Sequence, residues 1–204
     1  MEKRQEMLKG LQGKVEELQT AKESVKNFVE TMEAIKAEGD SAIKDLEKQI
    51  ADTKEAQAMA TDIGEAKLLN TQVKNLEEEL QLTKGVVTAQ GNKQKQELEQ
   101  VVTELLKVYK ACKFMFSAVD NEVTATASIR TFDKDIETMT DLGHQVDTGV
   151  AYAKAVLIKY GVITNSTSTY ADVYLNSVGC HSKVNHVKSK LIALISDFRV
   201  NGIV

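Results

Sequence analysis

Apolar residues recur at alternating spacings of three and four along most of the chain. The pattern is most regular between residues 98 and 119, where the repeating positions are Leu98, Val101, Leu105, Val108, Cys112, Met115 and Val119. Such spacing places the side chains on one side of an α-helix and is typical of helices that pack along a seam. We therefore predict a long helix here, with these residues facing inward.

The same periodicity predicts two helices before this seam. One apolar stripe runs from about residue 3 to residue 38, and a second helix begins near Ile43. Between them, the sequence Gly39-Asp40-Ser41 predicts a stop and a restart, because glycine readily ends a helix and Asp or Ser caps the next one. The second helix is expected to end near Gly91, with Gly85 as an earlier and weaker alternative.

Residues 56–67 do not keep the heptad phase of the second helix. Two interpretations compete: a stutter inside one continuous helix, or a turn in which Thr61 or Asp62 caps a new helix. Continuity is favoured, because Ala56, Met59 and Ile63 still follow helical spacing.

The pattern loosens over residues 120–131, which suit a bend, a short strand or an exposed helical segment. A helical stripe resumes at Phe132, and Gly161 is expected to end it. Residues 164–169, TNSTST, predict a loop, because short hydroxyl side chains compete for backbone hydrogen bonds. A last helix is predicted from about Tyr170 to Arg199.

The composition strengthens the helical interpretation, since the 204 residues include no proline and only 11 glycines. Proline breaks helix interiors and supplies many turns, so its absence favours long helices with few loops. We therefore predict an all-α protein, in which long antiparallel amphipathic helices form an elongated, coiled-coil-like bundle.

Aromatic residues divide the chain into two halves. Phe28 is the only aromatic residue before residue 105, and the other nine lie between Tyr109 and Phe198. Aromatic side chains bury large areas and dominate compact cores. We predict a charged long-helix arm or hairpin over residues 1–104 and a denser helical head over 105–204, with one helix continuous across the boundary.

Charge and hydropathy exclude several classes of protein. The net charge is −4, whereas a nucleic-acid surface needs a strongly basic face, so no nucleic-acid partner is expected. The N-terminal sequence MEKRQEMLKGLQGK holds no apolar block typical of a signal peptide. The most apolar run, residues 150–163, is too short for a membrane span and contains Lys154 and Lys159, so a soluble protein is expected.

Residues able to bind metal cluster at Cys180, His181 and His186, but histidines five residues apart point to different sides of a helix. No metal site, cofactor or catalytic residue is therefore expected, and we predict that the protein is not an enzyme. Cys112 and Cys180 suit buried free thiols, although the sequence leaves a disulfide between them open.

The leading hypothesis is a non-enzymatic structural or assembly protein that associates with copies of itself or with helical subunits of a larger particle. The predicted interaction seam consists of Leu98, Val101, Leu105, Val108, Met115 and Val119. Burial of such apolar heptad positions supplies far more free energy than surface ion pairs do.

The alternative hypothesis is a membrane-active, pore-forming-like helical protein, in which residues 105–119 and 150–163 leave a bundle and enter lipid. Three lysines interleave with three aromatic residues in the first of these segments: Lys107, Lys110, Lys113, Tyr109, Phe114 and Phe116. This mixture is typical of a membrane-facing helix, and equally of a bundle helix whose lysines extend from its edge.

Overall fold

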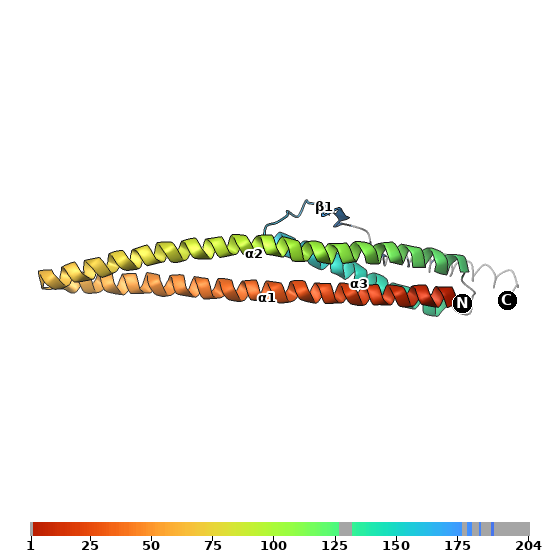
Figure 1. Ribbon diagram of the computed structural model, residues 1–204, viewed down its shortest axis with the longest axis horizontal. Helices are drawn as coiled ribbons and strands as arrows, with labels where there is room; N and C mark the ends of the chain where they lie inside the picture. Colours follow the sequence, from red (N-terminus) through yellow and green to blue (C-terminus); the bar gives the residue numbers. More distant parts are fainter. Residues whose placement is uncertain (1, 127–131, 177–178, 181–183, 185–188, 190–204) are drawn as a thin grey trace. The chain divides into compact units, whose positions relative to one another are not determined.

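The computed structural model describes residues 2–126, 132–176, 179–180, 184 and 189. These residues form three long helices and one short two-stranded hairpin (Figure 1). The elements are α1 (Glu2–Met59), α2 (Ile63–Thr126), α3 (Phe132–Lys159), β1 (Thr169–Tyr170) and β2 (Val173–Tyr174). Helix dominates the described residues, so the predicted all-α class is confirmed.

A short turn joins α1 to α2 at residues 60–62. The Glu65 N–H donates a hydrogen bond to Asp62 Oδ2 at 3.0 Å, and the Ala66 N–H donates to the Asp62 carbonyl, also at 3.0 Å. Asp62 therefore caps α2 in the usual N-cap manner. The favoured prediction of one continuous helix through residues 56–67 is wrong, and the alternative of a turn with an Asp62 cap is correct.

The glycines expected to end helices lie inside them. Helix α1 continues through Gly39, and α2 continues through Gly85 and Gly91, so the predicted breaks at residues 39–41 and 91 are wrong. A Cβ atom at Gly39 would lie 2.7 Å from Val87 Cγ2, which shows that this glycine allows a close approach between α1 and α2. An isolated glycine costs a helix about 1 kcal/mol, an amount that packing along a long helix offsets.

Contacts divide the chain into two compact units. One unit combines Met1–Val25 with Glu99–Val204, and we call it the three-helix unit; the other, Lys26–Leu98, we call the hairpin unit. Residues 1–25, which belong to the predicted arm, share a unit with residues 99–204. Helix α2 runs without interruption through residues 104 and 105, as expected for a helix that crosses the predicted boundary.

In the hairpin unit, α1 and α2 pack along a single apolar seam. Lys54 Nζ lies 2.7 Å from Glu77 Oε1, and Lys84 Nζ lies 2.9 Å from Glu47 Oε1, so the paired positions run in opposite order along the two helices. Between residues 63 and 93, the α2 positions that are not exposed are Ala66, Leu69, Val73, Leu76, Leu80, Thr83 and Val87. Their regular three-four spacing identifies the inward face of α2.

In the three-helix unit, all three helices contribute to one core. The Cys112 thiol of α2 contacts the backbone of α1 at Lys14, and a Cβ atom at Gly149 of α3 would lie 3.1 Å from Leu18 Cδ2 of α1. The largest fully buried side chains of this unit are Leu11, Leu18, Leu105, Leu106, Tyr109, Phe116, Met139 and Leu157. The predicted link between aromatic residues and a dense core therefore holds for Tyr109 and Phe116.

Helix α3 ends at Lys159, and Gly161 stops it as predicted. Gly161 has φ of +66°, its N–H donates to the Ile158 carbonyl, and the Val162 N–H donates to the Leu157 carbonyl. This pair of bonds is a Schellman motif, which needs a left-handed residue at its C′ position.

The segment after α3 differs from the prediction at its second half. Residues 164–168 form the expected loop, in which Thr164 Oγ1 lies 2.8 Å from Ser166 Oγ. The predicted helix is wrong over residues 170–176, because β1 and β2 pair around Ala171 and Asp172, whose φ values are +47° and +60°. Two such residues are typical of a type I′ hairpin turn. Beyond them, Cys180, Val184 and Ser189 are helical, and the rest of 177–199 lies outside the described residues.

Alanine substitutions at two glycines test the course of these helices. Gly91→Ala is expected to stabilise the protein by about 0.5–1 kcal/mol, because Gly91 lies in a helix interior with open space around it.

Gly161→Ala is expected to destabilise the protein by about 1 kcal/mol, because the backbone of Gly161 is in the left-handed region, which alanine adopts at a cost. Urea unfolding measures both effects, and a destabilising Gly91→Ala would contradict the continuity of α2.

Candidate interaction surface

The six predicted seam residues occupy two different environments. Leu98, Leu105 and Val119 are each 0% exposed, and the half-buried members are Val101, Val108 and Met115. Met115 lies against α1, since its Cε atom is 3.0 Å from the position of a Cβ atom at Gly10. Part of this seam is thus covered by the chain's own helices, and contact with a partner stays a prediction.

The buried face of α2 in the three-helix unit is wider than the predicted stripe. Four further residues are almost completely buried there: Val102, Leu106, Tyr109 and Phe116. They form a second stripe at three-four spacing beside the predicted one. A helix that packs against two other helices needs a wider apolar face than a helix that packs against one. The second stripe is the feature of the sequence that indicates this wider face.

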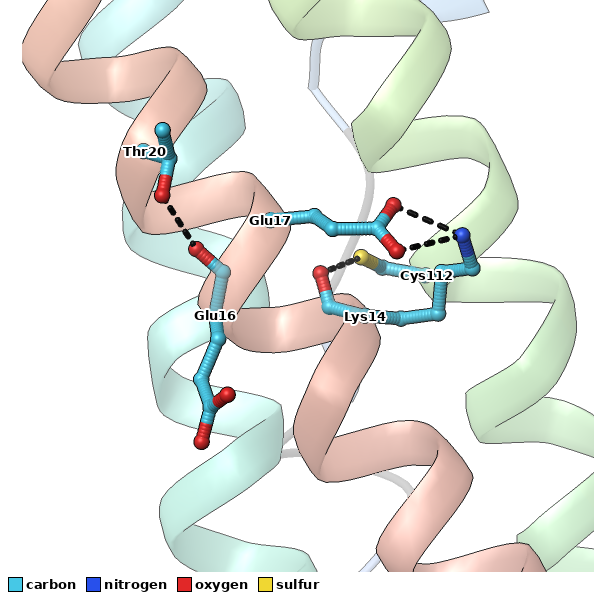
Figure 2. Close-up of polar contacts among 5 residues, drawn as sticks. All are labelled: Lys14, Glu16, Glu17, Thr20 and Cys112. Atoms are coloured by element: carbon cyan, nitrogen blue, oxygen red, sulfur yellow. Dashed lines mark hydrogen bonds and ion pairs between the residues drawn. The ribbon is translucent and has the colours of Figure 1, made fainter.

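The Cys112 thiol belongs to the packing between α1 and α2 in this unit (Figure 2). Its Sγ donates a hydrogen bond to the Lys14 carbonyl at 3.0 Å, and Lys14 Nζ lies 2.6 Å from Glu17 Oε2. The pKa of Cys112 is raised to about 11, chiefly by burial and also by the Glu17 carboxylate, while the Lys14 ammonium opposes the shift. A thiol held in its neutral form is a poor nucleophile, so Cys112 is a packing residue.

The other candidate chemical groups are also explained by packing. Cys180 is buried, and its backbone N–H donates to Asp147 Oδ1 at 2.9 Å. Cys112 and Cys180 form no disulfide bond, so the disulfide that the sequence left open is not formed. His181 and His186 lie outside the described residues, and among those that are described no group of His, Cys, Asp and Glu could hold a metal ion.

Large apolar side chains are exposed mainly in the hairpin unit. Leu68, Leu82 and Val86 of α2 are 62%, 71% and 55% exposed, and Met59 and Ile63 on either side of the turn are exposed to a similar degree. Leu68 and Leu82 are two heptads apart and Val86 is one turn further, so the three share one side of α2.

We call this side of α2 the outer stripe. It consists of the exposed residues Leu68, Gln72, Asn75, Glu79, Leu82, Val86 and Ala89. The sequence analysis missed it because each large apolar member stands beside a seam position: Leu68 precedes Leu69, and Val86 precedes Val87. Adjacent apolar residues such as Leu68-Leu69 and Val86-Val87 indicate a second apolar side, because only one residue of each pair can lie on the inward face.

One aromatic residue is exposed on α2 in the three-helix unit. Phe114 is 79% exposed, and the exposed Lys107 and Lys110 precede it by two turns and one turn of the helix. The other two aromatic residues of this segment, Tyr109 and Phe116, are buried. Of the mixture of lysine and aromatic residues in this segment, the exposed part is therefore the Phe114 ring with Lys107 and Lys110 on the same side of the helix.

None of the helices in the described ranges combines the length and the apolar character that crossing a membrane requires.

The raised pKa of Cys112 predicts a loss of stability at alkaline pH. Above about pH 9 the thiol ionises in the unfolded chain, while the folded protein keeps its proton up to about pH 11, so rising pH favours unfolding. The Cys112 contribution should amount to about 2–3 kcal/mol across this interval.

Urea unfolding of the wild type and of Cys112→Ala at pH 8.5 and pH 11 isolates this contribution, since other groups titrate equally in both proteins. The wild type should lose more stability than the variant. Equal losses in the two proteins would show that Cys112 ionises normally in the folded state.

Comparison with known proteins gives no relative: no protein-family model, no curated protein and no solved structure matches the chain.

Proposed function

We propose that this chain is a non-enzymatic structural or assembly protein, which associates with copies of itself or with other helical subunits by coiled-coil-like packing of heptad-spaced apolar residues. The observation that carries the proposal is the outer stripe, where Leu68, Leu82 and Val86 remain more than half exposed on one side of a long helix. Leu82 and Val86 form an exposed apolar pair one turn apart, and Leu68 lies on the same side of the helix two heptads before Leu82. Exposed apolar residues aligned on one side of a helix suit a helical partner.

The outer stripe suits a partner better than the predicted seam does. Leu105 and Val119 are fully buried, so they reach a partner only after the packing of the three-helix unit opens. Opening that core loses roughly 1.5–3 kcal/mol for each large side chain returned to water. Leu68 and Leu82 are accessible without any such change, and the Leu98–Val119 seam then serves to hold the subunit together.

The proposal assigns no catalytic residue and no cofactor. Cys112 is a potential nucleophile that the mechanism of an enzyme could use, yet its burial and its hydrogen bond to the Lys14 carbonyl favour the inactive thiol. The positions of Cys112 and Cys180 are explained by their burial in the three-helix unit.

A second candidate function is action on membranes, which the exposed Phe114 beside Lys107 and Lys110 favours. Insertion of residues 105–119 or 150–163 would require the three-helix unit to open, because Leu105, Val119 and Leu157 belong to its core. Dye release from anionic liposomes separates the two functions. Release that Phe114→Ser abolishes would support membrane action, and no release at micromolar protein would leave the assembly function as the better explanation.

Light scattering on a sizing column tests the assembly function directly. Across a tenfold concentration range, the wild type should show a mass above the 22.5 kDa of one chain, and that mass should rise with concentration. The double substitution Leu68→Glu with Leu82→Glu should shift the protein to the monomer, because it places charges on the outer stripe.

The matched control is Asn70→Glu with Gln81→Glu, which adds the same charge at exposed positions on the opposite side of α2. This control should associate as the wild type does, and circular dichroism should show equal helicity in all three proteins. A wild type that stays at 22.5 kDa at every concentration would contradict the self-association form of the proposal.

A further inference from the structure

Two leucines of the outer stripe, Leu68 and Leu82, lie symmetrically about Asn75. Leu68 and Leu82 each lie seven residues from Asn75, and seven residues are close to two turns of helix, so all three share one side of α2. In a dimer with two-fold symmetry, every contact occurs twice: if residue i of the first copy contacts residue j of the second, then residue j of the first copy contacts residue i of the second. Two outer stripes crossed antiparallel at Asn75 would therefore pair Leu68 with Leu82 twice.

The charges along α2 favour this antiparallel arrangement. With Asn75 at the centre, Glu78 and Glu79 of one copy lie opposite Gln72 and Thr71 of the other, which are uncharged. The Gln72 amide can donate a hydrogen bond to a carboxylate. A parallel pairing in register would instead place the acidic run 77–79 against itself. Like charges juxtaposed at an interface are unfavourable, so the antiparallel arrangement is the compatible one.

The size of the stripe indicates a weak dimer. Residues 64–86 cover roughly 35 Å of helix at 1.5 Å per residue, and a helix about 10 Å wide then offers a face of roughly 350 Å². Stable interfaces commonly bury about 800 Å² on each partner. An interface of this extent is expected to dissociate in the micromolar range.

From these observations we infer that the outer stripe is a homodimer interface, in which α2 packs antiparallel against α2 of a second copy, with Asn75 on the two-fold axis and Leu68 against Leu82. The inference rests on the proposed function and gives it a partner and a register.

Disulfide trapping of full-chain variants that each add one surface cysteine tests this register. Wild-type protein gives the background, since both of its own cysteines are buried. With copper phenanthroline as oxidant, Asn75→Cys should form covalent dimers by itself, because the two copies of residue 75 meet on the axis. Gln72→Cys and Glu78→Cys should cross-link several-fold more when mixed than either does alone, because residue 72 lies opposite residue 78.

The control variant Gln81→Cys, on the opposite side of α2, should stay at the wild-type background. Efficient cross-linking of Gln72→Cys alone and Glu78→Cys alone would overturn the antiparallel register in favour of a parallel one. If light scattering shows a multimer and none of the three variants cross-links, the inferred interface is wrong while the assembly function stands. A wild type that is monomeric throughout the micromolar range overturns the inferred interface and the self-association form of the proposed function.

Discussion

The packing of α2 against α1 is the interaction on which the rest of the structure depends. Helices of this length gain most of their stability from burial of an apolar face rather than from intrinsic helix propensity. In the hairpin unit this burial involves one regular stripe, centred on Val73, and in the three-helix unit it involves the wider face that contains Leu105 and Tyr109. The ion pairs beside the hairpin seam, such as Lys54 with Glu77, are exposed and contribute little by comparison.

The number of neighbours available to each helix explains where apolar residues remain exposed. In the described part of the three-helix unit, α1 and α3 pack with α2, and two adjacent apolar stripes of α2 are covered. In the hairpin unit, α2 has one helical neighbour within the unit, so an apolar residue placed outside the seam, such as Leu68 or Leu82, stays exposed. The same difference explains the aromatic residues, since large rings such as Tyr109 and Phe116 need surrounding helices to be covered.

Sequence reasoning predicted the helical class and the limits of α3 because strong local signals fix them. The apolar stripe begins at Phe132, and Gly161 supplies the left-handed residue that a Schellman motif requires. It misplaced the turn between α1 and α2 because a glycine inside a long packed helix has the same local sequence signature as a glycine that ends one. Gly39 serves the approach of Val87, a contact between residues far apart in the chain that periodicity does not reveal.

The other errors have equally specific causes. The β1–β2 hairpin turns at Ala171 and Asp172, a pair that lacks the Asn-Gly signal usual for its turn type, so the helical stripe around it dominated the prediction. The predicted seam identified Leu98, Leu105 and Val119 as buried positions, because heptad spacing does identify the inward face. Heptad spacing does not indicate whether the partner helix belongs to the same chain. Because α1 covers the inward face of α2, the outer stripe is the side of α2 that stays exposed in the hairpin unit.

The central claim is that the seam between α1 and α2 closes within one chain, which leaves the outer stripe for a partner. A distance between nitroxide spin labels in place of Glu47 and Lys84, whose side chains pair at 2.9 Å, tests it most directly. Measured by pulsed electron resonance, the doubly labelled protein should give one short distance that persists when it is mixed with a large excess of unlabelled chain and refolded. Loss of that distance on dilution would show that the seam forms between chains and would contradict the account.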